Sequence, residues 1–253
     1  MQLDDVMREL RGKANPRNVA GMARFGINPE NTLGISMAGL KPLAKRIGRD
    51  HGLALALWKT GVHEARTLSF LVDDPYKVTE AQMERWVSDF DSWDICDGCC
   101  LHLFDGTPYA WGKAVEWSKK DEEYVKRAGY TLMAVLAVHD KKADDARFIK
   151  LLPFIKKGSV DERNYVRKAV NWALRQIGKR NMALNEAAID TAEEILALDT
   201  KSSRWIARDA LRELESGKVQ AMLAKKALRL RAITAPKNSQ RLAAKSRSRA
   251  MRT

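Results

Sequence analysis

Apolar residues recur at intervals of three and four along almost the whole chain before residue 233, and no stretch shows sustained strand-like alternation. Such intervals place apolar side chains on one face of an α-helix, which has 3.6 residues per turn. The chain is therefore predicted to be all-α. The predicted helices span residues 3–14, 36–58, 62–72, 79–90, 92–103, 121–139, 143–155, 161–177, 185–198, 201–215 and 219–232.

A weak internal repeat indicates how these helices are arranged. The segment YVKRAGYTLMAVLA from Tyr124 aligns with YVRKAVNWALRQIG from Tyr165 at an offset of 41 residues, and WALRQI from Trp172 aligns with DALREL from Asp209 at an offset of 37. Periods near forty with a helix pair per unit are typical of HEAT or armadillo solenoids, in which the inner helices line a concave surface. We therefore predict an α-solenoid of HEAT-like repeats with a concave, basic groove.

The formal net charge of +13 is concentrated at one end of the chain. Residues 218–253 hold eleven Lys and Arg and no Asp or Glu, which leaves 34 basic and 32 acidic residues in 1–217. Blocks of like charge often form disordered arms that contact nucleic acid, and the alternative is a solvated tail without a partner. We predict an ordered domain over 1–235 and a basic, disordered tail over 236–253.

The sequence also indicates a compartment. No apolar run is long enough to cross a membrane, and MQLDDVMRELRGKANPR at the N-terminus lacks the apolar core of a signal peptide. We expect a monomer in the cytosol, with no membrane association. The three cysteines fall within five residues; Cys96-x-x-Cys99 with His102 could bind zinc, but no second ligand pair exists. We expect no metal site, and we expect the cysteines to be small core side chains.

One tryptophan of the predicted helix 161–177 lies away from its apolar stripe. Trp172 is more than roughly 100° from the centre of the stripe, at 100° per residue, and its neighbours are Lys168, Arg175 and Lys179. Core packing is the usual role of a helical Trp, but here the period favours display among cations. These cations and Arg180 are the predicted DNA contacts. The stripe comprises Val166, Ala169, Val170, Ala173, Leu174 and Ile177.

Two further helices present polar residues away from their apolar stripes. Arg127 falls opposite the stripe of 121–139, where the alternative is an ordinary solvated arginine. Trp93 and Asp97, four residues apart, share a side of 92–103 that differs from its apolar side. Packing alone does not account for Trp93 and Asp97.

Cations, tryptophans and one carboxylate together suggest chemistry on a nucleic acid. Lys and Arg hold phosphates, and Trp offers its π-face to a cation or a base. A carboxylate near a polyanion needs a positive charge forming beside it. Cleavage of an N-glycosidic bond supplies that charge, because the departing sugar carbon becomes oxocarbenium-like.

The sequence resembles the bacterial DNA alkylation repair glycosylases of the AlkD type, which are built from HEAT-like repeats. The resemblance extends from about Phe25 to about Leu214. Its most specific segments are VHEARTLSFLV at 62–72, SWDICD at 92–97, EEYVKRAGYTLMAVLA at 122–137 and VRKAVNWALRQIGKRN at 166–181.

The resemblance implies a substrate and a set of site residues. In that family the substrate is double-stranded DNA containing a purine alkylated at N3 or N7, and no metal or cofactor is used. The family's W-x-x-x-D segment matches Trp93 and Asp97, its catalytic-site arginine matches Arg127, and the Trp of its WALR segment matches Trp172. This chain has Ser92 where a second aromatic is expected, which leaves the substrate range open.

These residues predict a monofunctional DNA glycosylase that acts in base excision repair. Asp97 would stabilise the oxocarbenium ion and position or deprotonate water, Trp93 and Trp172 would contact the lesion or its sugar, and Arg127 would hold a backbone phosphate. The alternative is a non-catalytic HEAT-like scaffold that binds DNA or a protein, because this fold hosts many functions.

Overall fold

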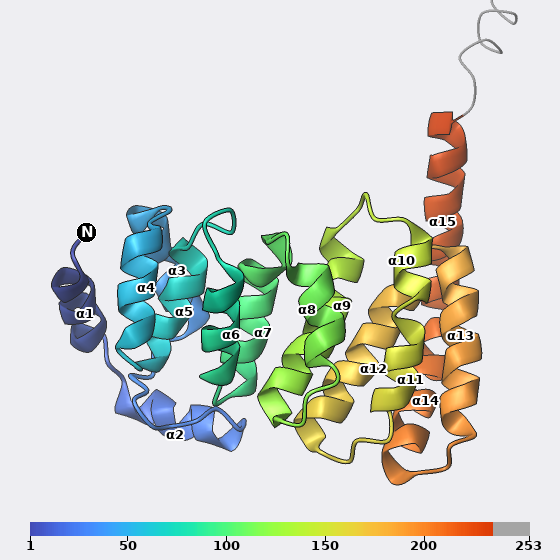
Figure 1. Cartoon of the computed structure of the whole chain (residues 1–253), viewed down its shortest axis with the longest axis horizontal. Helices are drawn as coiled ribbons and strands as arrows, with labels where there is room; N and C mark the ends of the chain where they lie inside the picture. Colours follow the sequence, from blue (N-terminus) through green and yellow to red (C-terminus); the bar gives the residue numbers. More distant parts are fainter. Residues whose placement is uncertain (235–253) are drawn as a thin grey trace, which may run out of the picture.

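The computed structural model describes residues 1–234, which form helices and one 3₁₀ turn, without a strand among them. The predicted tail over 236–253 lies outside this range. The chain advances along the long axis of the molecule, from α1 at one end to α13, α14 and α15 at the other (Figure 1). Their bounds are α1 Leu3–Gly12, α2 Pro16–Arg24, α3 Met37–Ile47, α4 His51–Lys59, α5 His63–Val72, α6 Glu80–Ser88, α7 Trp93–His102, η1 Phe104–Gly106, α8 Ala110–Trp117, α9 Glu123–His139, α10 Asp145–Ile149, α11 Leu152–Gly158, α12 Asn164–Gly178, α13 Met182–Leu196, α14 Lys201–Leu214 and α15 Gly217–Thr234.

The helices are stacked in two rows. Helices α5, α7, α9, α12 and α14 pack against one another in that order, while α4, α8 and α13 pack against members of this row from the side. Each pair thus buries its apolar stripe against the next pair, as in a helical solenoid. The predicted all-α solenoid architecture is confirmed.

Several predicted helix boundaries were wrong, each for a local reason. The predicted helix 36–58 is two helices, because Gly48 adopts φ 73° and the Asp50 side chain then accepts a hydrogen bond from the Leu53 N–H to start α4. Similarly, 143–155 is divided into α10 and α11, with a proline in the first turn of α11. Helices α2 and α8 were not predicted. The Asn15-Pro16 pair caps and begins α2.

The connection between α2 and α3 is held by the carboxylate of Glu64, which is fully buried in α5. It accepts hydrogen bonds from the backbone N–H groups of Leu33 at 2.8 Å, Gly34 at 2.7 Å and Ile35 at 3.0 Å. Gly34 has φ +82°, and a Cβ there would lie 2.2 Å from the carbonyl oxygen of Asn15, so only glycine fits. Glu64 therefore supports the packing of this connection against α5.

The apolar face of α7 carries the three cysteines. Cys96, Cys99 and Cys100 are free thiols with no exposed surface. Burial raises the pKa of Cys99 and Cys100 well above the usual range, which keeps these thiols protonated and unreactive. They are core residues, as predicted. Among the described helices, none combines the length and apolar character that a membrane span needs.

Candidate functional site

Asp97 and Arg127 form a two-pronged ion pair between α7 and α9. Arg127 Nε donates to Asp97 Oδ1 at 2.9 Å and Arg127 Nη2 donates to Asp97 Oδ2 at 2.7 Å, while Thr131 Oγ1 donates to Asp97 Oδ1 at 3.1 Å. This geometry fixes the carboxylate in one orientation. The Asp97 side chain keeps 20% of its surface exposed, so one edge of it can meet a ligand.

The structure corrects the prediction that Arg127 is a displayed cation. Its side chain is only 7% exposed, because α9 is packed by α7, α8 and α12 on several sides. Its Nη1 donates to the Tyr165 carbonyl oxygen at 2.6 Å, so most of its fork is occupied within the protein. Burial lowers the pKa of Arg127, but the charge and hydrogen bonds of Asp97 outweigh burial and raise it overall. Arg127 therefore stays cationic beside the Asp97 carboxylate.

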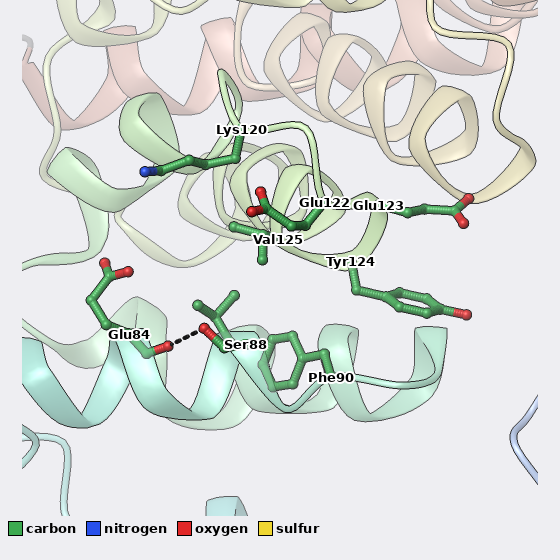
Figure 2. Close-up of a pocket in the computed structure, with 9 residues that line it drawn as sticks. Glu84, Ser88, Phe90, Lys120, Glu122, Glu123, Tyr124 and Val125 are labelled. Carbon is green, nitrogen blue, oxygen red and sulfur yellow. Dashed lines mark hydrogen bonds between the residues drawn. The ribbon is translucent and has the colours of Figure 1, made fainter.

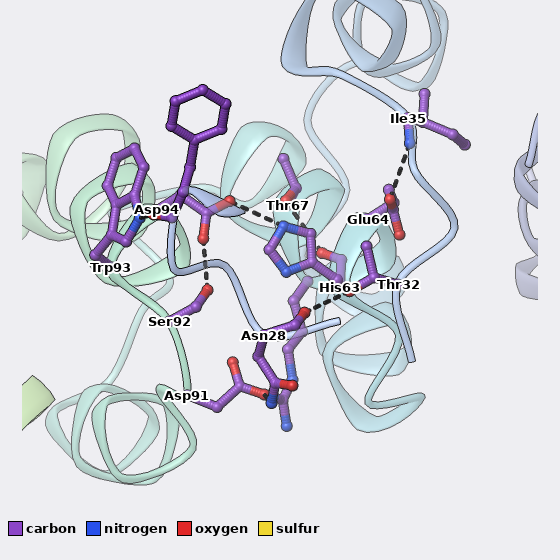
Figure 3. A network of polar contacts seen from close by, with 12 residues as sticks. Asn28, Thr32, Ile35, His63, Glu64, Thr67, Asp91, Ser92, Trp93 and Asp94 are labelled. Atoms are coloured by element: carbon purple, nitrogen blue, oxygen red, sulfur yellow. Dashed lines mark hydrogen bonds and ion pairs between the residues drawn. The ribbon is translucent and has the colours of Figure 1, made fainter. Parts of the chain in front are cut away.

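Trp93 is anchored by the chain that leaves α2. The indole Nε1 donates to the Phe25 carbonyl oxygen at 2.9 Å, and the phenyl ring of Phe25 is 76% exposed. Nearby, Asn28 Nδ2 donates to Asp91 Oδ2 at 3.1 Å. Figure 3 shows this junction, with Asn28 facing Asp91 and Trp93 at the start of α7. Residues 25–28 thus lie against α7 beside the Asp97 segment.

The same connection also contacts α12. Tyr165 Oη donates to the Gly26 carbonyl oxygen at 3.3 Å, and a Cβ at Gly26, where φ is +75°, would lie 1.9 Å from this hydroxyl. The Tyr165 ring lies 6.0 Å from the guanidinium of Arg127 and 5.7 Å from the ring of Tyr124. Tyr165 therefore joins the aromatic residues around the Asp97–Arg127 pair.

A pocket of about 580 Å³ adjoins Trp93 on the side of α2 and α3. His63 and Asp94 line it, with His63 Nε2 2.9 Å from Asp94 Oδ2, and the Asp94 carboxylate also accepts a bond from Ser92 Oγ (Figure 3). Ser92 is fully buried in this role. The residue at the position where a second aromatic was expected thus orients Asp94.

A second pocket, of about 330 Å³, lies between α6 and the start of α9 (Figure 2). Its lining includes the carboxylates of Glu84, Glu122 and Glu123 and one cation, Lys120. Burial, followed by neighbouring Tyr165 and Glu123, raises the pKa of Tyr124 to about 12, so this phenol stays neutral. The excess of carboxylates disfavours a polyanion here.

Trp172, on α12, is half-buried and packs against the core, so it is less exposed to solvent than the helical wheel predicted. Lys168, one turn earlier, is exposed, and no ion pair joins it to another described residue. The core stripe of this helix is confirmed, since all six of its members are buried.

The other three predicted DNA contacts have partners inside the chain. Arg175 and Lys179 both pair with Glu213 of α14, the latter at 2.7 Å. Arg180 Nη1 donates to the Ala137 carbonyl oxygen at 2.7 Å, and its guanidinium lies 4.0 Å from the Phe148 ring centroid. These cations stabilise the junction of α9, α12 and α14, and only the free part of each can meet a phosphate.

The structure brings together Trp93, Asp97 and Arg127, and it adds residues that the sequence did not single out. Thr131 and Tyr165 complete the surroundings of Asp97, and Phe25 stands exposed beside Trp93. No local pattern marks these three, since each contributes through a contact distant in sequence. The assembly is one oriented carboxylate, with Trp93 on the same helix and Tyr165 bonded through its carbonyl oxygen to Arg127.

Comparisons with known proteins agree with this architecture. A family model described as "DNA alkylation repair enzyme" matches residues 6–214, which include Trp93, Asp97, Arg127 and Trp172. A solved structure from "a new family of proteins related to the HEAT-like repeat DNA glycosylases with affinity for branched DNA structures" superposes with a TM-score of 0.69 at 22% identity, covering 77% of this chain and 83% of the other. No curated protein matches the sequence significantly.

Proposed function

Because this chain belongs to the DNA alkylation repair enzyme family, we propose that it is a monofunctional DNA glycosylase for purines alkylated at N3 or N7. The observation that carries the proposal is Asp97, a partly exposed carboxylate that Arg127 and Thr131 hold in one orientation. A scaffold that binds DNA without catalysis does not need an oriented carboxylate where it would meet the nucleic acid. The substrate would be duplex DNA.

The departure of the base requires little assistance from the protein. A purine alkylated at N3 or N7 is already cationic, so it departs as a neutral base with the electrons of the C1′–N9 bond. Positive charge then develops on the sugar at C1′ and its ring oxygen. The Asp97 carboxylate would stabilise that charge, and it would accept a proton from the water whose oxygen attacks C1′.

The role of Arg127 changes from the one expected from the sequence. Its Nε, Nη1 and Nη2 all donate hydrogen bonds within the protein, which leaves little of the fork for a DNA phosphate. We assign it as a positioning residue that holds the Asp97 carboxylate in one orientation.

The aromatic residues would contact the lesion. Trp93 is held by its bond to the Phe25 carbonyl, so its ring has a fixed direction. A cationic base near the face of Trp or Tyr gains about 0.5–2 kcal/mol from cation–π attraction, which favours the alkylated purine over its neutral parent. Trp93 and Trp172 are the proposed contacts, and Lys168 is a proposed phosphate contact.

The competing function is DNA binding without excision. It draws support from the solved protein of similar fold, which is related to the glycosylases and has affinity for branched DNA. The two functions differ in one measurable product. Only a glycosylase releases a free base.

The test is to incubate the protein with methylated duplex DNA and measure free 3-methyladenine and 7-methylguanine by chromatography. Wild-type protein should release one or both, and Asp97→Asn should bind DNA but excise on the order of 10²–10³-fold more slowly. The matched control is Asp91→Asn, which removes a carboxylate from the same segment. The Asp91 carboxylate accepts a hydrogen bond from Asn28 and not from Arg127. If the wild-type protein releases no base yet binds branched DNA, the competing function is the correct one.

A further inference from the structure

The end of the molecule opposite α1 contains a pocket that the proposed excision chemistry does not use. It measures about 690 Å³ and lies between the ends of α9 and α12 and one side of α15. Helix α15 begins at Gly217, beyond the residues 6–214 that the family model matches. The pocket thus depends on an element outside the matched region of the family. Its basic lining residues are Lys141, Lys179, Arg180, Lys226 and Arg229, with the single carboxylate of Asp145.

The positive charges of this pocket are poorly compensated inside the protein. Lys226 Nζ donates to the Lys179 carbonyl oxygen at 2.7 Å and, more weakly, to that of Arg180 at 3.5 Å, and neither partner is a carboxylate. Burial, followed by the charges of Lys141, Arg180 and Lys179, lowers the pKa of Lys226. These cations therefore repel one another, and an anion between them would relieve the repulsion.

Two of the lining cations have no partner at all among the described residues. Lys141, after α9, and Arg229, on α15, are both exposed, and no ion pair or side-chain hydrogen bond engages either. The carboxylates nearby are committed elsewhere, since Glu213 pairs with Lys179 and Asp145 accepts two bonds from Asn181. Lys141 and Arg229 are thus free to bind an external anion.

The position of the pocket suggests what that anion is. Tyr165, at the start of α12, contacts Arg127, and Lys179 directly follows the end of the same helix. The fourteen residue steps from Tyr165 to Lys179 span about 21 Å at 1.5 Å per residue. Phosphates follow one another every ~3.4 Å along a DNA strand, so a separation of this size corresponds to about six nucleotides.

We propose that the pocket between α9, α12 and α15 binds phosphates of the duplex backbone some distance from the lesion, chiefly through Lys141, Lys226 and Arg229. This second contact rests on the proposed function only in taking DNA as the ligand, and it does not require excision. It would hold the duplex in register while Asp97 acts, because backbone contacts fix orientation without reading sequence.

The test measures binding of a fluorescein-labelled, undamaged duplex over a series of salt concentrations. The double variant Lys141→Ala/Arg229→Ala should bind more weakly at low salt. The slope of log K against log salt should become shallower by about 0.9 for each phosphate that the variant no longer binds, so by up to about 1.8. Neither side chain bonds to the rest of the described structure, so the thermal unfolding curve should not change.

The matched control is Lys45→Ala/Lys59→Ala, which removes the same charge from exposed lysines of α3 and α4 near the other end of the molecule. A full wild-type slope in the Lys141/Arg229 variant, or an equal reduction in the control, would overturn the proposal. The proposal would also fail if inorganic phosphate raised the melting temperature of the wild type but not of the variant, while the variant kept the wild-type salt slope for DNA. The pocket would then be a site for small anions. Because the probe is undamaged DNA, these results stay separate from any failure of excision.

Discussion

At the scale of single residues, the Asp97–Arg127 pair is the feature on which the proposed chemistry depends. Both prongs of the Arg127 fork reach the carboxylate, and a lysine cannot reproduce that planar, two-pronged geometry. The pair is also largely desolvated, with the arginine 7% and the aspartate 20% exposed. The arginine therefore fixes the direction of the Asp97 carboxylate.

We predict that Arg127→Lys slows excision by on the order of 10²-fold, because a displacement of about 1 Å in a reacting group has an effect of that size. Single-turnover assays should show this decrease with little change in DNA affinity. If Arg127 acts through Asp97, the double variant with Asp97→Asn should be no slower than Asp97→Asn alone. A weaker affinity and a shallower salt dependence would instead mean that Arg127 holds a phosphate.

A second residue-scale prediction concerns His63 and Asp94. Burial lowers the pKa of His63, but the hydrogen bond and charge of Asp94 outweigh it, so the pKa is raised above 6.5. Burial raises the pKa of Asp94, but the bonds from His63 and Ser92 outweigh it, so the pKa is lowered below 3.8. The charged pair therefore contributes fully between pH 3.8 and 6.5, and its contribution falls as pH rises through the raised pKa of His63.

The difference in melting temperature between wild type and His63→Gln should accordingly be largest in this acidic window, and it should shrink toward alkaline pH. Thermal unfolding followed by circular dichroism at a series of pH values measures it. A difference that is constant with pH would show that His63 contributes only packing.

At the scale of elements, the short connection between α2 and α3 makes hydrogen bonds with three helices, α5, α7 and α12. It supplies the carbonyl groups that hold Trp93 and Tyr165, and the buried Glu64 side chain fixes its far end. Gly26 and Gly34 of this connection have positive φ, which glycine adopts readily, and neither has room for a Cβ. The fixed path of this connection is what presents Phe25 beside the candidate site.

We predict that Glu64→Gln destabilises the protein by about 1–3 kcal/mol, because a single amide oxygen cannot satisfy three buried N–H groups and the new NH₂ opposes one of them. Denaturant unfolding measures the decrease, and excision should fall as the connection loosens. Glu30→Gln is the control, since Glu30 is exposed in the same connection. Equal stability of the two variants would contradict the role given to Glu64.

At the scale of the whole molecule, the excess positive charge and the proposed catalytic residues lie in different parts of the chain. Residues 1–217 are nearly neutral with 34 basic and 32 acidic side chains, and the excess charge follows from residue 218 onward. Helix α15 carries part of this excess to the cationic pocket. The described cations of α15 thus add positive charge at the end of the molecule farthest from α1, which would orient a duplex along the stack.

Truncation after Ala235 should weaken duplex binding at low salt and make its salt dependence shallower. The removed segment holds Lys237, Arg241, Lys245, Arg247, Arg249 and Arg252 and no acidic residue, and each phosphate contact contributes about 0.9 to the slope. Single-turnover excision at saturating enzyme should barely change, because Asp97 and both site tryptophans remain. The prediction fails if the truncated protein keeps the full slope, or if it binds normally and cannot excise.

Local patterns in the amino-acid sequence were enough to predict the fold class and much of the core. The interval of three and four residues specifies a helix and its buried face, because that face is set within one segment. The stripe of α12 and the cysteine face of α7 were predicted correctly on this basis. The family resemblance is confirmed as well, while the catalytic and DNA-binding roles of individual residues stay predictions.

The pairing of the polar residues, in contrast, was set by how the helices pack in three dimensions. A helical wheel describes one helix, so it could not show that neighbouring helices surround Arg127 or that α14 supplies Glu213 to Arg175 and Lys179. The partners of Asp97 and Trp93 are 30 and 68 residues away in sequence, respectively. Such pairings arise when separate elements pack together, and no local periodicity encodes them.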